Sequence, residues 1–113
     1  MNSLRAYVTG GTGFIGYHLI DSLVESGWLV TALHRPDSAT NHLKKLGVNL
    51  VHGDLTKKDT ILDTLPNGID SIFHVAGNVS FSSINNYIQN KDNIVGTRNL
   101  IDAAIEKKCK RFI

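Results

Sequence analysis

The sequence predicts an α/β fold, a doubly wound parallel β-sheet with helices on both faces, and three observations predict it. Segments with the apolar pattern of a strand alternate strictly with segments that have the pattern of a helix. The strand segments are nearly continuous apolar runs, as expected when both faces of a sheet are buried. A cluster of glycines joins the first strand to the first helix. At 113 residues, 42% of them hydrophobic, the chain suffices for one domain with one core.

The first elements follow from their local patterns. Residues 4–9 form a short apolar run that ends at the glycine cluster, which is typical of a buried strand. Residues 14–26 carry aliphatic side chains at four-residue spacing, so we expect an amphipathic helix that Gly27 ends. Residues 28–33 are expected to form the second strand.

The middle of the chain repeats the alternation with shorter elements. We expect a helix over 38–46, a strand over 48–52, a helix over 56–65 with Thr56 as its N-cap, and a strand over 70–76.

A long helical pattern covers residues 87–107, and residues 111–113 are expected to begin a fifth strand. A complete domain seldom ends on the first residues of a buried strand, because this leaves an unpaired edge. We therefore expect residues 1–113 to be the N-terminal part of a longer protein. The expected inner face of the long helix is Ile94, Thr97, Ile101, Ala104 and Ile105.

Composition excludes several classes of function. The net charge is +2 with basic and acidic residues interspersed, which does not favour a nucleic-acid partner. The single cysteine, Cys109, excludes an internal disulfide framework and a four-thiolate zinc site. His74 has no second ligand at metal-binding spacing, so we expect a core histidine and no metal. Without a signal peptide or an apolar run of about 18 residues, a cytoplasmic protein with no membrane partner is expected.

The glycine cluster at residues 9–16, TGGTGFIG, carries the strongest chemical signal. Glycine permits positive φ angles and a close approach of the backbone to a ligand. The helix that follows directs its free N–H groups and the positive end of its dipole at the loop, which favours a pyrophosphate. We expect Gly16 to let the helix pack close to the sheet. The position between strand and helix predicts a dinucleotide site, and the alternative is a structural turn without a nucleotide.

The glycines fit two spacings at once, Gly11-x-Gly13-x-x-Gly16 and Gly10-x-x-Gly13-x-x-Gly16. The second resembles the motif of the extended short-chain dehydrogenase/reductases, the NAD-dependent epimerase/dehydratase family, and in particular its dihydroflavonol-4-reductase-like members. The resemblance covers the whole chain and implies a Rossmann domain that binds NAD or NADP. Further stretches that agree in order and spacing are His34-Arg35-Pro36, Gly53-Asp54-Leu55, His74-Val75-Ala76-Gly77 and Asn93-Ile94-Val95-Gly96-Thr97.

The end of the second strand favours NADP over NAD. An NAD site places an acid there to bind the ribose hydroxyls, and an NADP site places an arginine for the 2′-phosphate. Residues 33–36 contain no acid, and Arg35 offers a fork of donors that matches a phosphate. NAD stays open, because Asp37 is close enough in sequence to serve the ribose. His34 is expected to pack at the strand end rather than to contact a phosphate.

The resemblance implies further cofactor contacts. Asp54 and Leu55 correspond to a pair beside the adenine, small residues at 75–77 let the backbone approach the cofactor, and Asn93 corresponds to a residue on the nicotinamide side. The full set of expected cofactor-binding residues is Gly10, Thr12, Gly13, Phe14, Ile15, Gly16, Arg35, Asp54, Leu55, Val75, Ala76, Gly77 and Asn93.

The resemblance implies that the catalytic and substrate-binding half is absent from residues 1–113, so catalytic residues are not expected in this chain. The resemblance implies a Tyr-x-x-x-Lys pair on the helix after the fifth strand, where the lysine lowers the pKa of the tyrosine. Tyr87 and Lys91 match this spacing but precede the fifth strand, so we interpret them as a solvated helix face. The resemblance also implies a homodimer through the long helix.

Three hypotheses follow, of which two assign a function and the third is a truncated product that folds poorly and has none. The first is the NADP(H)-binding part of an oxidoreductase that reduces a carbonyl or oxidises an alcohol, of the dihydroflavonol reductase, hydroxysteroid dehydrogenase or sugar-nucleotide epimerase type. Its small-molecule substrate would be held by the absent half. The second is a non-catalytic module, complete at 113 residues, that binds or senses a dinucleotide.

Overall fold

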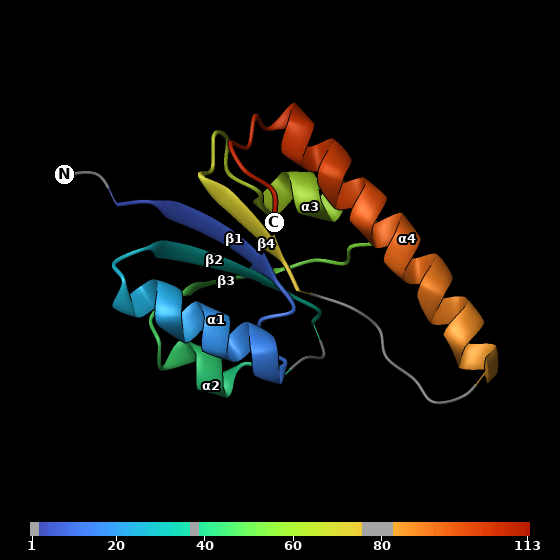
Figure 1. The fold of residues 1–113 in the computed structure, drawn as a ribbon, viewed down its shortest axis with the longest axis horizontal. Helices are drawn as coiled ribbons and strands as arrows, with labels where there is room; N and C mark the ends of the chain where they lie inside the picture. Colours follow the sequence, from blue (N-terminus) through green and yellow to red (C-terminus); the bar gives the residue numbers. More distant parts are fainter. Residues whose placement is uncertain (1–2, 37–38, 76–82) are drawn as a thin grey trace.

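The structure is a parallel sheet of four strands in the order β3-β2-β1-β4, with helices on both faces (Figure 1). This computed structural model describes residues 3–36, 39–75 and 83–113, and for 83–90 the backbone alone. The α/β fold class is thereby confirmed. The elements are β1 (Arg5–Thr9), α1 (Phe14–Glu25), β2 (Leu29–His34), α2 (Asn41–Lys44), β3 (Asn49–His52), α3 (Lys58–Thr64), β4 (Ser71–His74) and α4 (Ser83–Glu106).

The central strand β1 divides the core into two layers. Its Ala6 and Val8 face α1 and α2, where they pack with Ile20 and Leu43. Its Tyr7 faces α3 and α4 in a second cluster, and Figure 1 shows these two helix pairs on opposite sides of the sheet. Because every β1 side chain from Ala6 to Thr9 is buried, the apolar run in the sequence is explained by burial on both faces.

Residues 111–113 extend the sheet beyond β4, as expected for the beginning of a fifth strand. The Ile72 N–H donates to the Arg111 carbonyl at 2.9 Å, and the Ile113 N–H donates back to the Ile72 carbonyl at 2.8 Å. Phe112 lies opposite Ile72 in parallel register.

The inner face of α4 differs from the prediction. Ile94, Ile101 and Ile105 are exposed by 61%, 41% and 73%, whereas Leu100 is fully buried against α3 and the sheet. At Gly96 the helix approaches the segment after β3 closely, since a Cβ there would lie 3.0 Å from the Leu55 Cβ. This contact leaves no room for a large side chain at position 96, and Ile94, Ile101 and Ile105 are on the outer side of the helix. Of the predicted face, Ala104 is buried and Thr97 half-buried.

The beginning of α3 also differs from the prediction. Thr56 does not cap the helix, which begins at Lys58 after Lys57. The Thr56 hydroxyl instead donates to Asp54 Oδ1 at 2.8 Å, two residues earlier. The Thr56 hydroxyl therefore stabilises a local turn with Asp54 and does not cap the helix.

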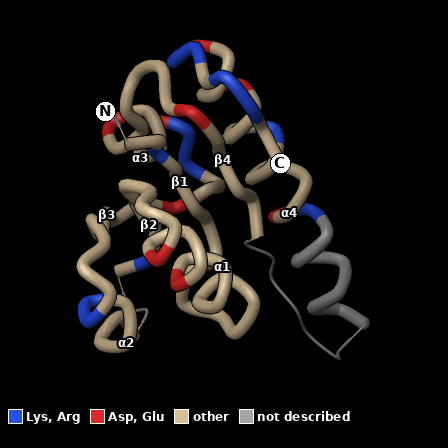
Figure 2. Tube along the Cα trace, turned by 60° about the vertical axis from the view of Figure 1, so that its left-hand side comes forward, with Lys and Arg blue, Asp and Glu red and all other residues tan. Residues whose placement is uncertain are grey.

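Several basic residues lie close together in the turn after α4, at Lys107, Lys108, Lys110 and Arg111 (Figure 2). The Gly68 N–H donates to the Lys107 carbonyl, which places this turn near the amino end of β4. These charges are therefore at the edge of the sheet opposite to the carboxyl ends of the strands. None of the helices in the described part of the chain has the length and hydrophobicity needed to cross a bilayer.

Candidate functional site

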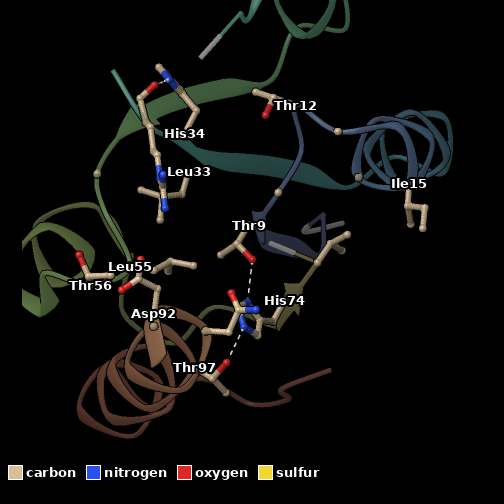
Figure 3. Close-up of a pocket in the computed structure, with 18 of the residues that line it drawn as sticks. Thr9, Thr12, Ile15, Leu33, His34, Leu55, Thr56, His74, Asp92 and Thr97 are labelled. Carbon is tan, nitrogen blue, oxygen red and sulfur yellow. Dashed lines mark hydrogen bonds between the residues drawn. The ribbon is translucent and has the colours of Figure 1, made fainter. Parts of the chain in front are cut away.

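A cleft of about 500 Å³ opens at the carboxyl ends of the strands. It lies where the strand order reverses, since β2 and β3 follow on one side of β1 and β4 is on the other. Its walls come from the glycine loop, the end of β2, the segment after β3, the end of β4 and one side of α4 (Figure 3). Open α/β sheets bind their ligands at this reversal, and the volume is within the range of small-molecule sites.

The glycine loop turns the chain sharply into α1. Gly10 has a φ of +75°, which favours glycine, and the Gly13 N–H donates to the Gly10 carbonyl at 3.2 Å. Gly13 is the N-cap of α1, and no side chain caps the helix. The first turn contains no acidic residue, so the N-terminal N–H groups and their partial positive charge are available to an anion in the cleft.

Gly16 is required by the loop itself rather than by the sheet. A Cβ at this position would lie 2.7 Å from the Gly10 carbonyl carbon and 2.8 Å from the Gly11 Cα. The sequence predicts close packing of α1 on the sheet, whereas the closest approach is between the first turn of the helix and the backbone of the loop.

Most of the predicted residues meet at this cleft. Ala76 and Gly77 lie outside the described residues, as do Asp37 and the segment 78–82, and Asp54 is not among the lining residues. The predicted residues that line the cleft are Gly10, Thr12, Gly13, Phe14, Ile15, Gly16, Arg35, Leu55, Val75 and Asn93.

The Asp54 carboxylate is fixed beside the cleft. Its Oδ1 accepts hydrogen bonds from the backbone N–H of Thr56 at 2.9 Å and from the Thr56 hydroxyl at 2.8 Å. These two bonds, with smaller contributions from the charges of Arg35 and Lys57, hold the pKa of Asp54 below its ordinary value. Both bonds use Oδ1, which leaves Oδ2 for another donor.

His74 joins three elements at the floor of the cleft. Its Nδ1 is 2.8 Å from the Thr9 hydroxyl on β1, and its Nε2 is 2.9 Å from the Thr97 hydroxyl on α4 (Figure 3). Neutral imidazole donates from one nitrogen and accepts at the other. A hydroxyl can donate or accept, so each of the two threonines is a suitable partner for either nitrogen. Both ring nitrogens therefore have partners, as expected for a core histidine, but His74 is half-buried and lines the cleft. In the described part of the chain, no group of three or more His, Cys, Asp or Glu is placed to hold a metal.

Because of this histidine, the stability of the protein is expected to decrease as the pH falls. Burial lowers the pKa of His74 below its ordinary 6.5, so the unfolded chain takes up a proton more readily than the folded one. The contribution of neutral His74 to the free energy of unfolding is therefore complete above pH 6.5. It decreases as the pH falls from 6.5 toward the pKa of His74 in the folded protein. Urea unfolding across this window measures it, and His74→Gln is expected to reduce the slope. If the free energy of unfolding of the variant depended on pH as steeply as that of the wild-type protein, His74 would not be the source of the pH dependence.

Sequence reasoning missed several lining residues. Thr9, Leu33 and Gly53 lie at or after the carboxyl ends of their strands, a position that was available as a signal. Gly96 and Thr97 belong to the stretch Asn93-Ile94-Val95-Gly96-Thr97 that carries the family resemblance, which was available as their signal. His34, predicted to pack at the strand end, also lines the cleft. The other lining residues that were not predicted are Thr56, His74 and Asp92.

Comparisons with known proteins agree with this geometry. The model of the NAD dependent epimerase/dehydratase family matches residues 6–113. A Synechocystis protein named "Putative dihydroflavonol 4-reductase" is 36% identical over 95% of this chain and 31% of its own length. Vestitone reductase from alfalfa is 31% identical with a TM-score of 0.76, over 96% of this chain and 34% of its own.

A UDP-glucose 4-epimerase from Thermus thermophilus, solved in complex with NAD, is 26% identical with a TM-score of 0.81, over 96% of this chain and 36% of its own. The chain thus spans about a third of the length of the proteins that it matches.

Proposed function

The chain belongs to the NAD-dependent epimerase/dehydratase family, and we propose that it forms the NADP(H)-binding part of an oxidoreductase that reduces a carbonyl or oxidises an alcohol. One observation carries the proposal: the cleft joins an uncapped helix N-terminus at the glycine loop to Arg35 at the end of β2. The helix N-terminus suits a pyrophosphate, and the Arg35 guanidinium suits a 2′-phosphate.

The residues of the cleft fit the parts of such a cofactor. The N–H groups after Gly10 would receive the pyrophosphate, and Leu55 would pack on the adenine. Beside the cleft, Asp54 Oδ2, which accepts no hydrogen bond from the residues that the structure describes, would accept from the adenine amino group. The Arg35 guanidinium would pair with the 2′-phosphate, while Asn93 and Val75 would border the nicotinamide. When bound, the cofactor supplies or accepts a hydride; this chain's own part is to bind and orient it.

The substrate and the proton donor belong to the proposal for the whole protein. The relatives carry the names of ketone reductases, a hydroxysteroid dehydrogenase and epimerases, which supports a small alcohol or carbonyl as substrate. We propose that a Tyr-x-x-x-Lys pair outside residues 1–113 supplies the proton. Lys91 lies exposed on α4, the helix that precedes residues 111–113, which supports leaving the Tyr87 and Lys91 spacing out of the chemistry.

Arg35→Ala tests the choice of cofactor. The exposed guanidinium is expected to make a charge-assisted bond to the 2′-phosphate, worth about 1.5–3 kcal/mol, or about ten- to a hundredfold in affinity. NADPH binding should weaken by this factor and NADH binding by less than about twofold. Titration of the fluorescence of each reduced cofactor measures both.

A matched control is Lys44→Ala, which removes one positive charge from α2 outside the cleft and should change neither affinity. Equal weakening of NADPH and NADH by Arg35→Ala would remove the NADP assignment. Absence of binding of either cofactor to the wild-type protein would overturn the proposed function.

A further inference from the structure

Two histidines face each other at the carboxyl edge of the sheet. His34 is the last residue of β2, His52 is the last residue of β3, and the two are partners in the parallel register. Their ring centroids are 4.6 Å apart, in an edge-to-face arrangement. His34 lines the cleft next to Arg35, and His52 is exposed behind it. The imidazole pair thus lies at the strand ends directly before Arg35, which lines the same cleft.

The hydrogen bond of His34 fixes which of its nitrogens carries a proton. Nδ1 is 2.8 Å from the carbonyl oxygen of Arg35, and a carbonyl only accepts, so Nδ1 must donate (Figure 3). In the neutral ring, Nε2 is therefore an acceptor, and it makes no hydrogen bond to the residues that the structure describes. Nε2 becomes a donor only when the ring takes up a proton.

The surroundings favour an anion at this point. Arg35 follows His34 directly, and Lys57 follows β3. On α2, His42 and Lys44 are not among the residues that line the cleft, and neither α1 nor α2 has an acid in its first turn. Asp54 is the nearby acid in the described segment after β3, and its Oδ1 is already engaged by Thr56. Among the described residues, positive charge therefore exceeds negative charge at this point.

We propose that His34, supported by His52, forms with Arg35 a site for the ribose 2′-phosphate of an NADP-type dinucleotide, and that binding takes up a proton on the imidazole pair. The inference rests on the proposed function, since it needs a dinucleotide in the cleft. It departs from the packing role that the sequence favours for His34, because Leu33 and Val51 already pack into the core from these strand ends. Histidine is suited to this role because its charge changes between about pH 5 and 8.

The test uses the protein expressed from its complete reading frame and two ligands that differ only in the 2′-phosphate, 2′,5′-ADP and 5′-AMP. Calorimetry at about pH 7.5, in two buffers of different ionisation enthalpy, counts the protons taken up on binding. At this pH the phosphate itself is mostly a dianion, since its second pKa is near 6. The wild-type protein is expected to take up protons with 2′,5′-ADP and not with 5′-AMP.

Three variants separate charge from packing. His34→Leu removes the donor and should lower the affinity for 2′,5′-ADP by about tenfold or more. The affinity for 5′-AMP should change by less than about twofold. His34→Gln keeps a neutral donor, so it should retain part of the affinity while losing the proton uptake. The matched control is His42→Gln, which removes an imidazole that packs on Tyr17 outside the cleft and should leave affinity and proton uptake unchanged.

The outcomes distinguish the two levels of the proposal. Binding of both ligands with the same proton uptake in the wild-type protein and in His34→Gln would overturn the role of the histidine pair alone. Equal weakening of both ligands by His34→Leu would also overturn it, because that points to packing. A wild-type protein that binds neither ligand, NADPH nor NADH would overturn the proposed function and this inference together.

Discussion

Gly13→Val is expected to abolish binding of NADPH and NADH while leaving the protein folded. Gly13 has extended backbone angles, φ −83° and ψ 175°, which valine adopts readily. The nearest atom to a Cβ there is the Gly10 carbonyl oxygen at 3.6 Å, an ordinary contact. The added side chain would therefore project into open space at the N-terminus of α1, where the pyrophosphate is proposed to lie.

The expected loss of affinity is about a hundredfold or more, because the phosphates would lose two or more charge-assisted hydrogen bonds. The cost in stability is expected to be about 1 kcal/mol, since valine is a poor N-cap. Cofactor fluorescence titration measures the affinity, and urea unfolding measures the free energy of unfolding. Far-UV circular dichroism checks that the helix content is unchanged. Undiminished affinity would refute the assignment of the loop to the cofactor.

Gly16→Ala is expected to have the opposite profile, a large loss of stability. The new Cβ would meet the Gly10 carbonyl carbon and the Gly11 Cα, which are backbone atoms and cannot rotate away. Overpacking of this kind costs typically about 1–3 kcal/mol and occasionally more, and we expect the upper end or above. Thermal unfolding should shift downward by more than about 10 °C, because about 1 kcal/mol corresponds to several degrees in a domain of this size.

The matched control for this change is Gly13→Ala, which adds the same methyl group three residues earlier on the same turn. It should melt within about 3 °C of the wild-type protein, because its Cβ meets only an ordinary contact. Similar melting temperatures for Gly16→Ala and the wild-type protein would show that the loop is able to move away from the helix.

The order of the elements could be predicted from the sequence because each strand and helix has its own local period. The glycine loop could be predicted for the same reason, since its signal lies within eight consecutive residues, 9–16. The inner face of α4 could not, because it depends on how closely Gly96 approaches Leu55, a residue about forty positions away. Isoleucines at helical spacing indicate an apolar side, and they do not show whether that side faces the sheet.

The residues that line the cleft could be predicted only in part from strand ends, since Thr9, Leu33 and Gly53 were missed there. Contacts that depend on two elements at once could not be predicted. Arg35 and Leu55 come from single segments. The contact of His34 with His52 needs the register of β2 against β3. The hydrogen bonds of His74 need the end of β1 and the phase of α4 together. Register and phase are set by packing between segments, and a local pattern does not contain them.

The uncapped N-terminus of α1 also bears on the kinetics of the site. Its partial positive charge and the Arg35 guanidinium lie at the mouth of the same cleft, without an acid in the first turn of the helix. A ligand with several phosphates is attracted by such a field before it makes contact, which raises the rate of productive encounters. Because the Debye length shortens to about 8 Å at physiological salt, added salt slows the arrival of the ligand. Once the phosphates are held close to the N–H groups, salt has much less influence on their escape.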